Sequence, residues 1–126
     1  SYERGPFLRE KLLFQEFRFG EALRSNKANR MFVRSAGAAR RDFEAPLFTI
    51  GSLQSNDVVL RDTSVSRRHA VVANFPDDVW IYDLSSAHGT RVGGESVNGR
   101  TFLDGVHDVE VGRASVEIGS RIDLLV

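Results

Sequence analysis

The sequence contains no cysteine, and its charges cancel because 17 basic residues balance 17 acidic ones. The absence of cysteine excludes a disulfide framework and a cysteine-based zinc site, which agrees with an intracellular protein and leaves its compartment open. The zero net charge means that no overall field draws the chain to nucleic acid, an anionic membrane or an acidic substrate. No apolar run of about 18 residues, the length that crosses a bilayer, is present, and the first ten residues lack the basic-then-apolar order of a secretory signal. Any charge selectivity must therefore be local.

What the chain has is a series of short β-prone runs from about Met31 onward, separated by Gly, Asn, Asp or Pro. Alternation in Val109-Glu110-Val111 and Val116-Glu117-Ile118 places one face in a core and the other in water, which is typical of antiparallel sheets. Turns are expected at Asn98-Gly99 and Asp104-Gly105. The predicted strands cover residues 31–34, 47–51, 58–60, 70–73, 79–83, 90–92, 95–97, 109–111, 114–118 and 121–125. The pattern predicts an all-β sandwich of two antiparallel sheets.

The first 28 residues differ from the rest, because apolar and charged residues are mixed there without β-turn signals. The i,i+4 pairs Leu8/Leu12 and Leu13/Phe17 predict a helix over residues 7–18, although residues 16–19 would also alternate as a strand. This helix could pack on its own sandwich or bind a partner, and disorder is the third alternative, which the many phenylalanines disfavour. The predicted organisation is a helical N-terminal extension, residues 1–28, followed by a β-sandwich domain, residues 29–126.

Several segments between Thr49 and Gly112 match the motifs of one family in the same order. They are Thr49-Ile50-Gly51, Ser55-Asn56-Asp57-Val58-Val59-Leu60, Val65-Ser66-Arg67-Arg68-His69-Ala70, Asp83-Leu84-Ser85-Ser86-Ala87-His88-Gly89-Thr90, and Leu103-Asp104-Gly105 with Val109 and Val111-Gly112. In this combination the chain resembles the FHA (forkhead-associated) domain family over roughly half its length. The resemblance implies an FHA-type β-sandwich without catalytic activity or cofactor, which docks a phosphothreonine-bearing partner protein through loops at one end.

The loop around Ser66 also has a physical reason to hold a phosphate. A phosphate carries nearly two negative charges and three acceptor oxygens, and residues 63–68 offer hydroxyl, backbone N–H and guanidinium donors. The alternative is a Ser/Thr-rich turn with solvated arginines. The resemblance implies that Ser66 and Arg67 bond the phosphate. The other positions expected to contact the phosphopeptide are Ser52, Ser64, Arg68, Ala87 and His88, with Arg61 and Arg68 as rim charges.

Four further residues are expected to support these loops. A lone histidine between apolar strand residues is more often a satisfied core group than a ligand, and the resemblance likewise gives His69 a bracing role. Gly89 permits a tight loop, and the Thr90 hydroxyl can tie that loop down. Gly51 ends the preceding strand.

Two positions depart from the family pattern. Ser52 stands where the family has an arginine that grips the ligand, and a lost charge-assisted bond of about 1.5–3 kcal/mol predicts binding weaker by roughly tenfold or more unless another basic group compensates. His88 stands where asparagine is usual. Histidine can donate and accept hydrogen bonds as asparagine does, and its imidazolium near a dianion would strengthen binding at mildly acidic pH.

Other functions have less support in the sequence. Ser66, His69 and Asp83 could form a hydrolytic set, but no nucleophile-elbow pattern frames a serine. The three histidines lack metal-ligand spacing, and no glycine-rich strand-to-helix frame indicates a nucleotide site. The alternative from a different class is a phospho-independent scaffold that uses its sheet faces or its Phe-rich N-terminal segment. The sequence leaves the partner and the oligomeric state open, and its extent suggests a piece of a longer protein.

Overall fold

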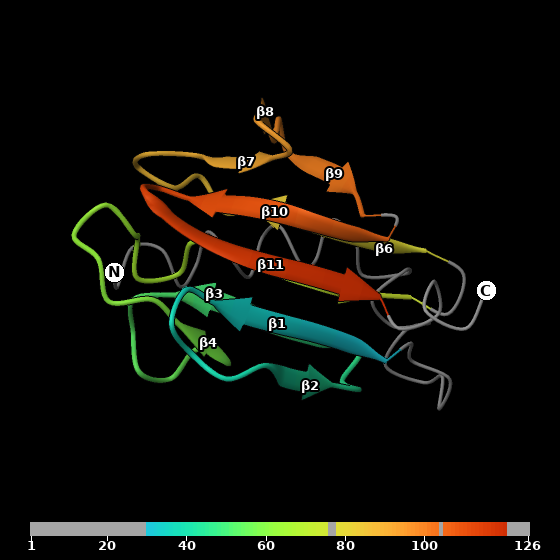
Figure 1. Ribbon diagram of the computed structural model, residues 1–126. Coiled ribbons are helices and arrows are strands. Elements are labelled where there is room, and N and C mark those ends of the chain that lie inside the picture. The colour runs from blue at the N-terminus through green and yellow to red at the C-terminus, as the bar shows by residue number, and fades with distance from the viewer. Residues whose placement is uncertain (1–29, 76–77, 104, 121–126) are drawn as a thin grey trace.

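The computed structural model describes residues 30–75, 78–103 and 105–120, which form two β-sheets packed face to face (Figure 1). One sheet has the strand order β2-β1-β11-β10-β7-β8, and the other has the order β4-β3-β5-β6-β9. The strands are β1 Met31–Ser35, β2 Arg41–Phe43, β3 Leu47–Gly51, β4 Val58–Val59, β5 Ala70–Asn74, β6 Val79–Asp83, β7 Thr90–Val92, β8 Glu95–Ser96, β9 Arg100–Phe102, β10 Val106–Val111 and β11 Ala114–Ser120. The prediction of an all-β sandwich is confirmed.

The core lies between the two sheets and follows the alternation that the sequence predicts. Val109 and Val111 of β10 and Ile81 of β6 are 0% exposed, because each points from its strand toward the opposite sheet. The core is formed by Met31, Val33, Phe48, Ile50, Val58, Leu60, Val65, Ala70, Val72, Val79, Ile81, Val92, Val97, Leu103, Val109, Val111, Val116 and Ile118. Apolar burial of this kind holds the two layers together and leaves the connecting loops free to carry function.

Some details of the strands differ from the prediction. The short strands β2 and β9 were not predicted, because Arg41-Asp42-Phe43 and Arg100-Thr101-Phe102 are charged or mixed runs at sheet edges. The expectation of purely antiparallel sheets is wrong at one place: β4 pairs with β3 in parallel over Ile50↔Val58 and Gly51↔Val59. The predicted N-terminal helix and the strand at residues 121–125 lie outside the described residues, and the boundary between the extension and the domain stays a prediction.

Three loops and one tight turn gather at one end of the sandwich, seen at the left of Figure 1. They are the β3–β4, β4–β5 and β6–β7 loops and the β10–β11 turn. Backbone hydrogen bonds join them: the Ser52 N–H donates to the Ser66 carbonyl at 3.1 Å, and the Gly112 N–H donates to the Gly89 carbonyl at 3.0 Å. The predicted site residues all come from this end. In the described part of the chain, no helix is long and apolar enough to cross a membrane.

Candidate functional site

The loops at this end enclose an open hollow of about 490 Å³. It is lined by Ser52, Asp62, Thr63, Ser64, Val65, Ser66, Arg67, Ala87 and His88. The fold therefore brings together six of the seven positions expected to contact a phosphopeptide, although they lie on three loops and up to 36 positions apart in sequence, from 52 to 88. The exception is Arg68, which does not line the hollow.

Ser66 is fixed in this hollow by the two neighbouring loops. Its Oγ accepts a hydrogen bond from the Ala87 backbone N–H at 3.1 Å, so the hydroxyl hydrogen remains available to a ligand. Its own backbone N–H donates to Nδ1 of His69 at 3.0 Å. Because Nδ1 accepts, Nε2 carries the proton of the neutral ring and donates to the Gly89 carbonyl at 2.8 Å. His69, which is fully buried, thus ties the β4–β5 loop to the β6–β7 loop.

The contacts of His69 also bear on the hydrolase alternative. Both ring nitrogens are bonded to backbone groups, and neither bond goes to a serine hydroxyl. A triad needs the histidine to accept the proton of the nucleophile. The hollow over Ser66 is moreover open at the surface, whereas an acyl-transfer site needs a deeper pocket. The geometry gives Ser66 and His69 no nucleophile-base relationship.

The β6–β7 loop is held by the carboxylate of Asp83 at the end of β6. It accepts hydrogen bonds from the Ser86 hydroxyl at 2.6 Å, from the Ser86 backbone N–H at 3.2 Å and from the Thr90 hydroxyl at 2.7 Å. The Gly89 N–H in turn donates to the Ser86 hydroxyl at 2.9 Å. The loop passes through Ser85 at φ 55° and Gly89 at φ 83°. Ala87 and His88 are thereby presented at the tip of a loop whose ends are fixed.

The β3–β4 loop approaches the Ser66 loop so closely that only glycine fits at position 51. A Cβ there would lie 2.1 Å from the carbonyl oxygen of Arg67 and 2.7 Å from Nδ2 of Asn56. The buried Asn56 side chain donates to that same Arg67 carbonyl at 2.7 Å and to the Leu53 carbonyl at 2.8 Å. Asn56 accepts from Arg68 at 3.2 Å, and Arg68 also donates to Ser55 Oγ at 3.0 Å. Arg68 therefore braces the β3–β4 loop, whereas the sequence predicted a place for it at the rim of the binding site.

Ser64 was expected to contact the phosphopeptide, but it is only 2% exposed and its hydroxyl already both donates and accepts a hydrogen bond within the protein. The hydroxyl donates to the Asp62 carboxylate at 2.6 Å and accepts from the Arg113 backbone N–H at 2.7 Å. The side-chain and backbone hydrogen bonds from Ser64 hold the pKa of the Asp62 carboxyl below its ordinary value of 3.8, and nearby Arg113 acts in the same direction. Ser64 thus links the β4–β5 loop to the β10–β11 turn.

Several residues that support the site were not predicted from the sequence. Asp83 and Ser86 each accept a hydrogen bond from a backbone N–H three positions later, which is a recognisable turn pattern in a sequence. Asn56 instead donates its side-chain amide to the Leu53 and Arg67 carbonyls. Arg113 gave no signal, because only folding brings the β10–β11 turn beside Thr63, where its guanidinium donates to Oγ1 at 3.3 Å. Within the described residues, no group of three or more His, Cys, Asp or Glu is arranged to hold a metal ion.

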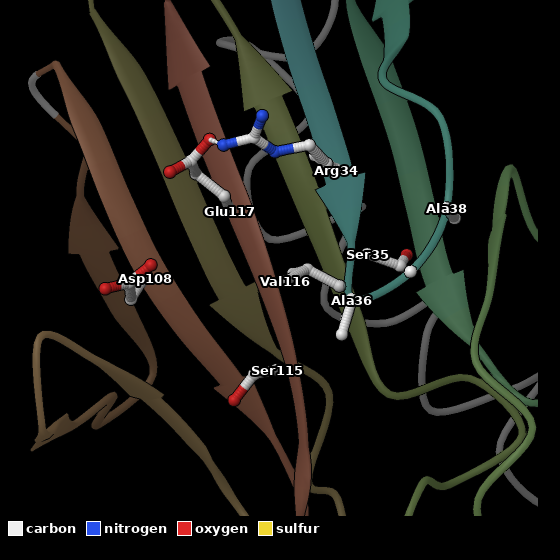
Figure 2. Close-up of a pocket in the computed structure, with 9 residues that line it drawn as sticks. Arg34, Ser35, Ala36, Ala38, Asp108, Ser115, Val116 and Glu117 are labelled. Atoms are coloured by element: carbon white, nitrogen blue, oxygen red, sulfur yellow. Dashed lines mark hydrogen bonds and ion pairs between the residues drawn. The ribbon is translucent and has the colours of Figure 1, made fainter.

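A second open hollow, of about 260 Å³, lies on the outer face of the six-stranded sheet, over β1, β10 and β11 (Figure 2). Its lining includes Arg34, Ser115 and Glu117, and the Arg34 guanidinium bonds the Glu117 carboxylate at 2.8 Å across adjacent strands. With Asp108 nearby, it carries more negative than positive charge. The carboxylates of this hollow would repel a phosphate, so its residues are suitable controls for the hollow around Ser66.

The comparisons with known proteins agree with this architecture. The FHA domain model matches residues 48–124. The transcriptional regulatory protein EmbR of Mycobacterium tuberculosis is 38% identical over 65 residues, which are 51% of this chain and 17% of EmbR. This chain therefore spans less than a fifth of the length of that relative.

Three solved structures show the same fold. The FHA domain of the CT664 protein from Chlamydia trachomatis superposes with a TM-score of 0.65 at 28% identity, covering 71% of this chain and 96% of that one. Mycobacterium tuberculosis EmbR in complex with a low-affinity phosphopeptide gives a TM-score of 0.68 at 25% identity, covering 72% of this chain and 24% of that one. A structure from an analysis of phosphothreonine-dependent FHA domain interactions has a TM-score of 0.66 at 22% identity, covering 71% and 95% of the two chains. This chain belongs to the FHA domain family, a family of non-catalytic binding modules.

Proposed function

We propose that this chain binds a phosphothreonine-bearing segment of a partner protein in the hollow at the loop end of the sandwich. The observation that supports this best is the position of Ser66. Its hydroxyl is oriented by the Ala87 N–H and its backbone by buried His69, beside the exposed guanidinium of Arg67. Such a fixed cluster of neutral and charged donors is suited to phosphate, because no reorganisation is needed when the ligand arrives.

Each lining residue has a role in this proposal. Ser66 and Arg67 would donate to the phosphate oxygens, while His88 and Ala87 at the tip of the β6–β7 loop would meet the peptide backbone on the other side of the hollow. Threonine is preferred over serine in line with the family resemblance. The proposed function is binding alone, which requires neither a cofactor nor catalytic turnover. We propose an intracellular partner, as kinases act there.

Arg113 is the basic group that we propose compensates for Ser52. Its guanidinium lies beside Thr63, its side chain is 76% exposed, and it is 4.0 Å from the Asp62 carboxylate that lines the hollow. It can neutralise that carboxylate, which would otherwise repel a phosphate, and can swing toward the ligand. Arg113→Gln should weaken phosphopeptide binding by about tenfold, the equivalent of one charge-assisted bond. Arg91→Gln, which removes an exposed arginine paired with Glu110, should leave binding unchanged.

The test is binding of a degenerate phosphothreonine peptide library and its unphosphorylated counterpart to the chain and to the double variant Ser66→Ala with Arg67→Ala. We expect phosphate-dependent binding by the unmodified chain and its loss in the variant. The matched control is Ser115→Ala with Arg34→Ala, which removes the same residue types from the hollow of Figure 2. If both libraries bind equally, or if the control pair abolishes binding as well, the proposed site is wrong.

A second candidate, a phospho-independent scaffold, is favoured by two features of the hollow. Ser52 replaces the ligand-gripping arginine of the family pattern, and Asp62 adds a negative charge to the lining. Under this alternative, partners are bound through a sheet face or the N-terminal segment. Binding of a partner that survives both phosphatase treatment and the Ser66→Ala, Arg67→Ala pair would support it.

A further inference from the structure

A second apolar cluster lies outside the main core, on the other face of the β5–β6 sheet. It consists of Val71, Ala73, Phe75, Tyr82 and Leu84. In β5, Val71 and Ala73 alternate with Ala70 and Val72, which belong to the core between the sheets. Since successive side chains of a strand point to opposite faces, the cluster faces away from the other sheet. We call this surface the outer β5–β6 face.

The outer β5–β6 face is buried to a degree that two layers do not explain. Its five members are 0–8% exposed, and every residue of β5 is buried. In an antiparallel sandwich the outer face of each sheet normally contacts water and carries polar residues. In the described part of the chain, the apolar side chains packed against the cluster are Leu47 and Trp80, which come from the same sheet. Burial of this degree is typical of a sheet face that is covered by a third layer.

Aromatic side chains extend the outer β5–β6 face toward the sheet edge. Trp80 contacts Phe102 of β9 edge-on, with ring centroids 5.4 Å apart. The Arg100 guanidinium lies over the Trp80 ring at 4.2 Å. Phe102 is 44% exposed, so apolar surface reaches as far as β9. Large aromatic surfaces of this kind favour apolar partners over water.

We propose that the N-terminal extension of this same chain, residues 7–23, forms that third layer. It carries enough large apolar side chains to cover the face, namely Phe7, Leu8, Leu12, Leu13, Phe14, Phe17, Phe19 and Leu23. The six residues after Ser120 carry no aromatic residue and follow β11, which belongs to the other sheet. The inference is independent of phosphate binding, which concerns the loops at the end of the sandwich.

The place where the extension joins the domain makes this arrangement possible. Arg30 forms an ion pair with Glu44 at 2.7 Å, and Glu44 lies in the short connection from β2 to β3. This connection leads directly to Leu47, which packs against the cluster. Strands in a sheet are about 4.8 Å apart, and an extended chain covers about 3.3 Å per residue, so the six residues 24–29 can cross several strands. The extension can therefore start beside the outer β5–β6 face.

The absence of cysteine allows a direct test with the full chain. A nitroxide spin label is attached to the single cysteine of Gln15→Cys, and the amide signals of the isotope-labelled protein are recorded before and after reduction of the label. We expect loss of signal intensity at Val71, Ala73 and Tyr82. Little loss is expected at Ser115 and Glu117, which lie on the outer face of the other sheet, about 10 Å or more further away. A label at Ser115→Cys should give the reverse pattern.

The outcomes separate the possible occupants. No intensity loss on the outer β5–β6 face, or a loss confined to the other sheet, overturns the proposal. Intensity loss that persists when isotope-labelled unmodified chain is mixed with spin-labelled unlabelled chain would assign the face to a second copy and also overturn the proposal. A second measurement uses the full chain with Phe14→Asp and Phe17→Asp. We expect its Trp80 emission to shift to longer wavelength and to be quenched more readily by acrylamide, whereas an unchanged spectrum would contradict the proposal.

Discussion

Replacing Gly51 with alanine tests the claim that two loops are pressed together beneath the binding hollow. The added Cβ would lie 2.1 Å from the Arg67 carbonyl oxygen and 2.8 Å from its carbon, whereas real Cβ atoms essentially never come within 3.0 Å of another heavy atom. The loops must therefore separate by about 1 Å to restore van der Waals distance. The contact is with backbone, so no side-chain rotation can relieve it.

The cost has two parts. Forcing atoms into a packed region costs about 1–3 kcal/mol, and moving the Arg67 carbonyl weakens its 2.7 Å bond from Asn56, worth about 1 kcal/mol. We expect Gly51→Ala to lower the free energy of unfolding by about 2–4 kcal/mol. Because Arg67 moves with its carbonyl, phosphopeptide affinity should fall as well, even though the substitution adds no group to the hollow.

Urea unfolding followed by Trp80 fluorescence measures the stability, and calorimetric titration with a selected phosphopeptide measures the affinity. Gly37→Ala is the control, because Gly37 has φ 74° but nothing within 4 Å of an added Cβ. It should show only the left-handed backbone cost of about 1–2 kcal/mol and unchanged affinity. If Gly51→Ala is no less stable than Gly37→Ala, the inferred close approach of the two loops is incorrect.

Two further predictions concern the charged and polar groups that brace the loops. The Asp62 carboxyl should titrate below its ordinary pKa of 3.8, and Ser64→Ala should raise that pKa, as followed by carboxyl-carbon NMR. Since the folded pKa is the lower one, this carboxylate contributes stability above its unfolded pKa and loses it as the pH falls through the folded value, so Asp62→Asn should flatten the acid limb of the stability profile. Thr90→Val removes the bond from a buried hydroxyl to the Asp83 carboxylate and should cost about 1.5–3 kcal/mol in urea unfolding; a change below about 0.5 kcal/mol would refute the bracing role.

The sequence was informative wherever a local pattern has one physical solution. Alternation in β10 and β11 predicted their inward faces, because the side chains of a strand alternate with a period of two. Burial of His69 and the positive φ of Gly89 could be expected from the residue types alone. The strands β2 and β9 were not predicted, because both lie at sheet edges and are held mainly by backbone pairing with one neighbour. Such strands need few buried apolar residues, so their composition does not distinguish them from loops.

The sequence by itself determined the family, the two-sheet sandwich and the set of loops from which the hollow is built, since these depend on spacing and residue type along the chain. Only the tertiary structure decided which side chains of those loops face a ligand. Ser64 and Arg68 have the same donor chemistry as Ser66 and Arg67, yet their hydrogen bonds go to Asp62 and Asn56, and Arg113 joins the site from a distant turn. Direction and pairing of a polar side chain depend on which acceptors lie within about 3 Å after folding, and that is a property of several loops together.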